Sequence, residues 1–485
     1  MNLPFSRLAR AVTFSILLTA NLNATFAQAA RTRTRHQTKP AILERNVRAE
    51  LGFLASDAMQ GRGSATGYER IAAEYIASQF LQFGLEPAGD ADTSGKKGFT
   101  QRVALETLKF TEAPVLSATL RTDVHKWQFG RDLLVSFMRV PHVSGELQVM
   151  DADGLPMKGA VVVIRLPEGA ESQQRQELIR KARMAQAAIV VMVESEANRK
   201  VREAGDVKLP VLPVRIAGDS TDNPLAAIVL RKDAFDQLVA MPAGTKVEFG
   251  GATQSAEAGA TWNAVSVLRG SDPTAAKDAI VLSAHLDHLG VGEAVNGDSI
   301  FNGADDDASG CVAVLELARA LASGQRPRRT VYFVCFGSEE RGGHGARYFV
   351  AHSPVPLAHV VADVTFEMIG RPDSKVPANT LWLTGYDRST LGPELTRQGA
   401  QLVADPHPEQ NFFQRSDNYT MALRGVVAHT ISSFGLHTDY HRPSDEIAKI
   451  NFPFMTHSIR SLIAPIRWLA DSSFRPTWVP GGAPH

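Results

Sequence analysis

The sequence predicts an α/β fold, in which helices cover both faces of a mostly parallel sheet and a β-rich module is inserted into the chain. From about residue 262, continuous apolar strands alternate with helical segments, which is typical of parallel strands buried on both faces. Between about 110 and 250, strand-like runs dominate instead. The 485 residues also exceed one ordinary domain, so we expect two units.

The first 29 residues have the pattern of a secretory signal peptide. Arg7 and Arg10 precede an apolar run at 11–20, and Ala27-Gln-Ala29 is a small-residue cleavage site. The run is too short to cross a membrane, and no later run reaches the ~18 apolar residues that a span needs. We therefore expect a secreted or periplasmic protein without membrane contact after the signal is removed.

Two helices are predicted next, in the N-terminal part of the main domain (30–108). Val47, Leu51 and Leu54 form a short apolar stripe at helical spacing, and a longer stripe runs from Tyr68 to Phe83. Between them lies the sequence Gly61-Arg-Gly63.

The inserted module is assigned to residues 109–255. Strands are predicted at 147–150, 160–165, 188–193 and 211–214, with one helix at 173–187. No cluster of histidine, cysteine or paired acids accompanies them, so we interpret the module as non-catalytic.

The main domain resumes at 256–472, before a tail at 473–485. Its predicted elements are strands at 279–284, 330–336, 360–366, 381–384 and 426–431, and a helix at 308–322. Cys311 and Cys335 lie in apolar patterns, so we expect buried free thiols.

Polar residues follow the ends of these strands. Ligands of open parallel sheets bind beyond the carboxyl ends of the strands, so we expect distant residues to meet at one edge. The set comprises His285, Asp287 and His288, then Asp305–Asp307, Glu339 and Glu340, Glu367, and finally His437, Asp439, Tyr440 and His441.

Imidazole and carboxylate groups without cysteine suit catalytic zinc. Two ions need a bridging carboxylate, and Asp306 can bridge, because the helix start beside it would stabilise its charge. Glu340 can bind metal while Glu339 stays free as a base for a metal-activated water. Each motif alone is more often a surface pair, a helix cap or a charged turn. Their joint position at strand ends favours a site.

The segments AHLDHLG, NGADDDASG, FGSEERGG, FEMIGR and HTDYHRPSDE, in this order, resemble the co-catalytic zinc aminopeptidases. That family includes glutamate carboxypeptidase and the catalytically inactive transferrin receptor, and glutaminyl cyclases are relatives with one zinc. The resemblance covers about 262–470 strongly and 45–105 more weakly. It implies a zinc exopeptidase fold and two zinc ions per chain.

The resemblance also implies residue roles. His285 and Glu367 would hold one zinc, Glu340 and His441 the other, and Asp306 would bridge them. Glu339 would be the general base, Asp287 would orient His285, Tyr440 would stabilise the tetrahedral intermediate, and a strained peptide bond would join Asp306 to Asp307. Position 367 is glutamate where the best-known members have aspartate. His288 and His344 match no required histidine, so we treat them as non-ligands.

The inserted module resembles a protease-associated domain, through MKGAVVVIRLPEG followed by KARMAQAAIVVMVES. In the family such insertions cover the site. A passive lid and a role in substrate recognition both stay open.

The sequence therefore predicts a secreted zinc aminopeptidase that acts on the N-termini of peptides. A glutaminyl-cyclase-like acyltransferase with one zinc, a carboxypeptidase and a non-catalytic ectodomain are the alternatives. A carboxypeptidase would need a guanidinium to bind the substrate carboxylate, and Arg415 and Arg442 are candidates. Lys plus Arg equals Asp plus Glu at 51 each, which gives no reason to expect nucleic acid as a partner.

Overall fold

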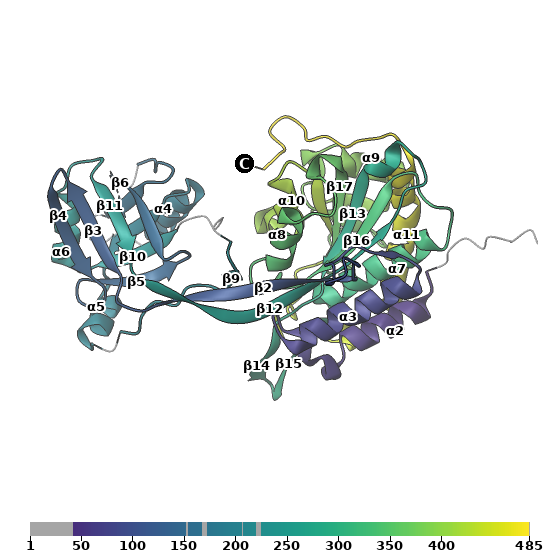
Figure 1. Ribbon diagram of the computed structural model, residues 1–485, viewed down its shortest axis with the longest axis horizontal. Helices are drawn as coiled ribbons and strands as arrows, with labels where there is room; N and C mark the ends of the chain where they lie inside the picture. The colour runs from purple at the N-terminus through teal and green to yellow at the C-terminus, as the bar shows by residue number, and fades with distance from the viewer. Residues whose placement is uncertain (1–41, 152–153, 167–171, 206, 220–224, 485) are drawn as a thin grey trace, which may run out of the picture.

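The computed structural model describes residues 42–484 except 152–153, 167–171, 206 and 220–224. The predicted signal peptide lies outside the described residues. The described chain forms two lobes joined by a long antiparallel ribbon (Figure 1). The ribbon consists of β2 (Thr100–Phe110) and β12 (Thr253–Leu268), which pair along most of their length.

The larger lobe is built on a ten-stranded sheet, and this confirms the predicted α/β class. The sheet order is β19-β18-β20-β17-β13-β16-β12-β2-β9, with β1 beside β12. The four strands β20, β17, β13 and β16 are parallel to one another, whereas the ribbon strands pair antiparallel to their neighbours. β18 pairs antiparallel with β20 and parallel with the edge strand β19. The bounds are β1 (Glu86–Pro87), β9 (Arg215–Ile216), β13 (Ala279–His285), β16 (Thr330–Phe336), β17 (Val360–Phe366), β18 (Leu381–Leu383), β19 (Leu402–Ala404) and β20 (Ala428–Ser432).

Helices cover both faces of this sheet (Figure 1). Successive side chains of a strand point to opposite faces, so Ile280 and Leu282 of β13 join one apolar core while Ala279 and Val281 join the other. The first core is covered by α2 (Glu44–Leu54), α3 (Gly67–Gln82), α7 (Gly310–Ala322), α9 (Leu391–Arg397) and α11 (Phe452–Asp471), and the second by α8 (His344–Ala351) and α10 (Asn418–Ala422).

The smaller lobe has its own sheet and its own apolar cores. The strand order is β4-β3-β11-β6-β7-β8-β10-β5. The bounds are β3 (Val115–Leu120), β4 (Asp123–Gln128), β5 (Leu133–Met138), β6 (His142–Met150), β7 (Val161–Ile164), β8 (Ile189–Val193), β10 (Ala226–Leu230) and β11 (Lys246–Gly250), with helices α4 (Ser172–Met184), α5 (Glu196–Glu203) and α6 (Lys232–Val239).

The strand predicted at 211–214 is wrong. Val211 makes only an isolated bridge to Lys109 and is 87% exposed. Pro210 and Pro213 have no backbone N–H for a sheet ladder, which explains why the pairing does not extend here. The chain forms the short strand β9 just beyond and pairs with β2.

Three smaller features complete the description of the fold. The hairpin β14 (Gly290–Val295) and β15 (Asp298–Phe301) projects from the larger lobe (Figure 1). Cys311 and Cys335 are buried free thiols, as expected from their apolar surroundings. Among the helices of the described residues, none has both the length and the apolar character needed to cross a bilayer.

Candidate metal centre

The predicted ligands converge at the carboxyl ends of the parallel strands. His285 is the last residue of β13, Glu340 lies in the loop after β16, and Glu367 directly follows β17. Asp306 lies in the turn that enters α7, and His441 comes from the loop after β20. This is the edge at which open parallel sheets bind ligands.

Asp306 belongs to two groups of possible metal ligands. The ligand atoms of His285, Asp306 and Glu367 lie within 4.8 Å of one another, and so do those of His288, Asp306 and Glu340. Nε2 of His285 is 3.2 Å from Oδ1 of Asp306. One carboxylate therefore faces two groups of donors, which is the geometry of a bridging ligand.

His441 joins the second group. Its Nε2 lies 3.2 Å from Oδ2 of Asp306 and 3.2 Å from Oε2 of Glu340. His288, which the sequence did not single out as a ligand, lies there too, with Nδ1 2.8 Å from Oε1 of Glu340. That contact lacks hydrogen-bond geometry, and both ring nitrogens of His288 are buried without a hydrogen-bond partner. The second position thus offers two imidazoles.

The donors present fit divalent cations. Oε1 of Glu340 and Oε2 of Glu367 are buried and have no hydrogen-bond partner. Burial and the neighbouring charge of Asp306 raise the pKa of Glu367 to about 7, although His285 opposes the shift. Closely spaced carboxylates with unpartnered oxygens are stabilised by a bound cation, and imidazole with carboxylate suits zinc.

The histidine rings respond to the same negative charge. Burial lowers the pKa of His441, but its contacts with Asp306 and Glu340 outweigh this and raise the pKa to about 10. The surroundings therefore stabilise a positive charge at the ring, where a metal ion would carry it instead.

Glu339 lies beside the centre without belonging to either triad. Burial raises the pKa of Glu339 well above its usual value, although the neighbouring His285 opposes this shift. The negative charges of Asp417, Glu367 and Glu340 raise the pKa further. Its backbone N–H donates to Oδ1 of Asp287 at 3.0 Å. The loop is therefore fixed while the Glu339 carboxyl group stays uncommitted to a metal triad.

The Asp287 carboxylate bonds to the loop that contains Glu339 and Glu340 rather than to His285. Its carboxylate accepts hydrogen bonds from the N–H groups of Glu339 and Glu340 and from the hydroxyl of Ser64. Nδ1 of His285 lies 3.1 Å from the Asp287 backbone carbonyl oxygen but 3.8 Å from its carboxylate. Residue 287 thus orients His285 mainly through its main chain.

The three consecutive aspartates have different surroundings, and the Asp306–Asp307 peptide bond is cis. Asp305 accepts from the Gly370 N–H at 2.8 Å, and Nε2 of His437 lies 3.1 Å from its carboxylate. Asp307 accepts from the backbone of His285, Gly310 and Met368. Hydrogen bonds to the backbone and to His437 therefore occupy the outer two aspartates, and Asp306 alone of the three belongs to the triads.

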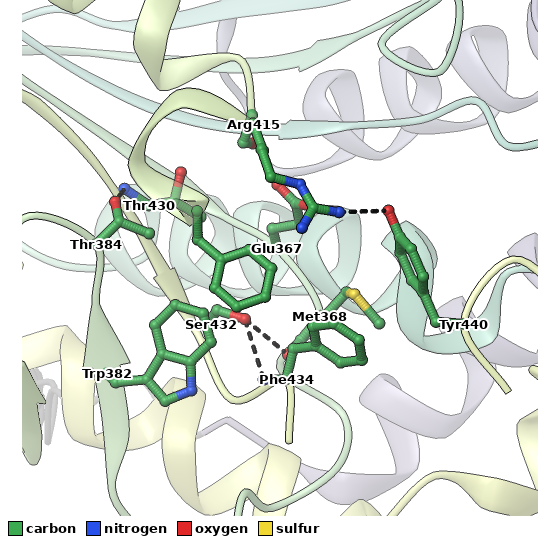
Figure 2. Close-up of a pocket in the computed structure, with 11 residues that line it drawn as sticks. Glu367, Met368, Trp382, Thr384, Arg415, Thr430, Ser432, Phe434 and Tyr440 are labelled. Atoms are coloured by element: carbon green, nitrogen blue, oxygen red, sulfur yellow. Dashed lines mark hydrogen bonds between the residues drawn. The ribbon is translucent and has the colours of Figure 1, made fainter. Parts of the chain in front are cut away.

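A small pocket opens beside Glu367 (Figure 2). Nη2 of Arg415 donates to the Tyr440 hydroxyl at 3.4 Å, and the guanidinium lies over the Phe412 ring. The Tyr440 ring stacks on His441 with centroids 3.8 Å apart. The lining is Glu367, Met368, Trp382, Thr384, Phe412, Arg415, Ser416, Thr430, Ser432, Phe434 and Tyr440. Arg442 is not among these residues.

Sequence reasoning gave no role to two acids at the centre, although Asp445 lies in the quoted segment HTDYHRPSDE. The Asp445 carboxylate accepts from the backbone N–H groups of Asp305 and Asp306. Asp417 is buried, neither carboxylate oxygen has a hydrogen-bond partner, and burial raises its pKa well above the usual value. Neither follows a predicted strand directly, so strand-end position gave no signal for them.

Comparison with known proteins gives a family match over the part of the chain that contains this centre. Residues 263–464 match the model of peptidase family M28. The leupeptin-inactivating enzyme 1 of Streptomyces exfoliatus is 32% identical over 118 residues, which are 24% of each chain. The probable lipoprotein aminopeptidase LpqL of Mycobacterium tuberculosis is 25% identical over 287 residues, which are 57% of this chain and 51% of that protein.

The chain thus spans about half or less of the curated relatives it matches. Among solved structures, an aminopeptidase from Aneurinibacillus sp. strain AM-1 is similar over 92% of this chain and 97% of its own, with 18% identity and a TM-score of 0.49. All five predicted metal ligands lie within residues 263–464, the part of the chain that matches the model of peptidase family M28.

Proposed function

We propose that this protein is a secreted aminopeptidase that holds two zinc ions per chain and removes N-terminal residues from peptides. The observation that carries the proposal is the pair of triads that share Asp306. The family match supports peptide hydrolysis, and the combination of imidazole and carboxylate donors suits zinc. The name of the Mycobacterium tuberculosis relative supports the N-terminal direction.

In this proposal each ligand has one role. His285 and Glu367 would hold one ion, Glu340 and His441 would hold the other, and Asp306 would contribute to both. His288 also belongs to the second triad, but in this proposal it is not a ligand. When bound, the zinc pair polarises the scissile carbonyl and lowers the pKa of a coordinated water toward ~7. The two unpartnered carboxylate oxygens of Glu340 and Glu367 support this assignment.

Glu339 moves the proton. Its carboxylate takes a proton from the attacking water and returns it to the leaving amine, which is general base and then general acid catalysis. The Tyr440 hydroxyl, on the ring that stacks on His441, would donate a hydrogen bond to the tetrahedral intermediate.

The pocket beside Glu367 would take the side chain of the N-terminal residue. Its aromatic and methionine walls suit an apolar side chain. The surplus of buried acids at the centre, including Asp417, favours a positively charged amino terminus close by.

Carboxypeptidase action is a second candidate, because Arg415 lines the pocket. Among the described residues it has no carboxylate partner, and its hydrogen bond is to the Tyr440 hydroxyl. A guanidinium in this position can bind a substrate carboxylate with two hydrogen bonds.

Secretion is proposed from residues 1–29, whose basic start, apolar run and small-residue cleavage site form an export signal. A relative that is named a lipoprotein is consistent with export. The N-terminal sequence of protein recovered outside the cytoplasm tests this, and cleavage after Ala29 is expected.

The function is tested by metal analysis together with a substrate panel. Elemental analysis should give two zinc ions per chain, whereas one ion would favour the glutaminyl-cyclase-like alternative. Aminoacyl chromogenic amides with a free amine should be cleaved, and the same amides with an acetylated amine should not. Cleavage confined to substrates with a free C-terminal carboxylate would replace the aminopeptidase with the carboxypeptidase.

A further inference from the structure

The segment Arg62–Glu69, here called the N-terminal clamp, lies outside the residues that match the family model. It connects the short helix η1 (Asp57–Arg62) to the first turns of α3. None of its residues is a predicted ligand, yet its side chains reach the three segments that carry His285, Asp306 and Glu340.

Arg62 joins two of these segments directly. Its fully buried guanidinium donates from Nε to the Leu286 carbonyl at 2.9 Å and from Nη2 to the Gly303 carbonyl at 2.9 Å. Nη1 donates to the carbonyls of Asn302 and Leu54 at 2.7 and 2.6 Å. Leu286 follows His285, and Gly303 begins the turn that carries Asp306. Because the guanidinium is planar and rigid, these bonds fix the spacing between the two ligand segments.

The backbone of the N-terminal clamp also forms hydrogen bonds with the segment that follows His285. The His288 N–H donates to the Arg62 carbonyl at 3.2 Å, and the Ser64 N–H donates to the His288 carbonyl at 3.3 Å. Arg62 has φ 47° and Gln60 has φ 45°, in the left-handed region. Such a conformation costs a non-glycine residue ~1–3 kcal/mol and persists only where its surroundings enforce it.

Ser64 and Glu69 reach the loop of Glu339 and Glu340 by two routes. The Ser64 hydroxyl donates to Oδ2 of Asp287, whose carboxylate in turn accepts from both glutamate N–H groups. Oε1 of Glu69 accepts from the Ser338 N–H at 2.8 Å, directly before Glu339. Glu69 is itself fully buried and also accepts from the Thr261 hydroxyl at 2.6 Å.

The charge of Arg62 also suits this place. Burial lowers its pKa, and the carboxylates of Asp287, Asp306 and Asp307 oppose that shift. A buried cation costs free energy unless it is compensated. Here the compensation consists of four hydrogen bonds to carbonyl oxygens and the negative charge of the nearby carboxylates.

We propose that the N-terminal clamp positions the metal ligands, so that Arg62, Ser64 and Glu69 set the affinity of the centre for zinc without touching metal or substrate. This rests on the proposed zinc function. The hydrogen bonds of the clamp keep the segments that carry the metal ligands at a fixed spacing. Removal of these bonds would allow the segments to move apart, so the first helices contribute to metal binding.

The test compares Arg62→Lys with Arg329→Lys. Arg329 is also buried and donates to two carbonyls, of Leu469 and Phe474, but it lies at the opposite end of β16 from the centre. Both variants should lose thermal stability as apo proteins. Only Arg62→Lys should weaken zinc binding, by about 10-fold or more, the size found for groups that orient metal ligands. Competition with a chromogenic chelator measures the dissociation constants, and circular dichroism verifies the fold.

A gentler pair keeps the test decisive if Arg62→Lys does not fold. Ser64→Ala removes the hydroxyl that donates to Asp287, and Glu69→Met removes the acceptor of the Ser338 N–H while it keeps the length of the side chain. Ser461→Ala on α11 removes a hydroxyl that bonds only locally to Ser458. At least one clamp variant should bind zinc more weakly than the Ser461 control. Unchanged affinity in every folded clamp variant would overturn the positioning role. Failure of the unaltered protein to bind zinc would instead refute the proposed function.

Discussion

At the scale of single residues, the assignment of Glu339 as the base gives the sharpest prediction. Glu339→Gln keeps the size of the side chain and the backbone hydrogen bond to Asp287 but cannot accept the proton. Turnover of a free-amine substrate should fall by ~10²–10⁴-fold, the usual contribution of general base catalysis. Zinc content should stay unchanged, whereas Glu340→Gln should lose metal. Near-normal turnover in Glu339→Gln would remove the residue from this role.

Asp363 of β17 gives a prediction on pH. Burial raises its pKa to about 7, although the hydroxyls of Ser283 and Thr365 oppose the shift. The folded protein therefore keeps a proton that the unfolded chain releases above about pH 4, and stability from this group is lost as pH rises toward 7. Asp363→Asn should stabilise the apo protein at pH 8, by on the order of 4 kcal/mol, and have little effect at pH 4. Urea unfolding at both pH values measures this, and an equal effect at both would contradict it.

The sequence predicted which side chains meet at the centre, but it did not predict the hydrogen bonds that hold the backbone around them. His285 and Glu340 follow recognisable strand ends, and Asp306 precedes a recognisable helix, so chemistry and position agreed before the structure was known. Asp445 could not be found this way, because its partners are backbone groups of Asp305 and Asp306 some 140 residues earlier in the chain. Only the topology of the sheet brings such groups together.

At the scale of elements, the turn before the clamp depends on Gly61. A Cβ at this position would lie 2.4 Å from the Phe301 carbonyl oxygen and 2.6 Å from that of Gly290, both backbone atoms of the β14–β15 hairpin. Its φ of +65° adds to the strain. Gly61→Ala should therefore destabilise the fold by ~2 kcal/mol or more, the range of positions with an incompatible backbone. Gly67→Ala, which meets nothing within 4 Å, is the matched control and should be near neutral in denaturant unfolding.

Element type was easier to predict than element pairing. The apolar strands β13, β16 and β17 were placed within a residue or two, because a buried parallel strand is a continuous apolar run. The ribbon strand β12 was not predicted. Its first half, TQSAEAGA, has few residues that favour strands, and its conformation comes from its partner β2. Long-range pairing of this kind leaves little trace in the sequence.

At the scale of the whole molecule, the alternation of strands and helices predicted the class of fold and the edge that carries the centre. It did not predict the antiparallel pairs on both sides of the four parallel strands β20, β17, β13 and β16. The antiparallel strands at the flank come from the ribbon, which leaves the larger lobe, carries the smaller lobe and returns. All five predicted ligands come after the ribbon strand β12 in the sequence and lie in the larger lobe. We therefore expect the metal centre to form without the smaller lobe.

That independence can be tested by removal of the smaller lobe. Lys109 and Gln254 are direct partners in the ribbon, so an Asn-Gly turn between them would close a β-hairpin in place of residues 110–253. The shortened protein should unfold cooperatively and bind as much zinc as the full chain. It should be somewhat less stable, because β9, the buried side chain of Ile216 and the ion pair of Asp219 with Arg347 are lost. Ile216→Ala in the full chain, with an expected cost of ~2–5 kcal/mol, calibrates the apolar part of that loss. A shortened protein that folds but binds no zinc would mean that the smaller lobe is part of the metal centre, because every other contact named at the centre is retained.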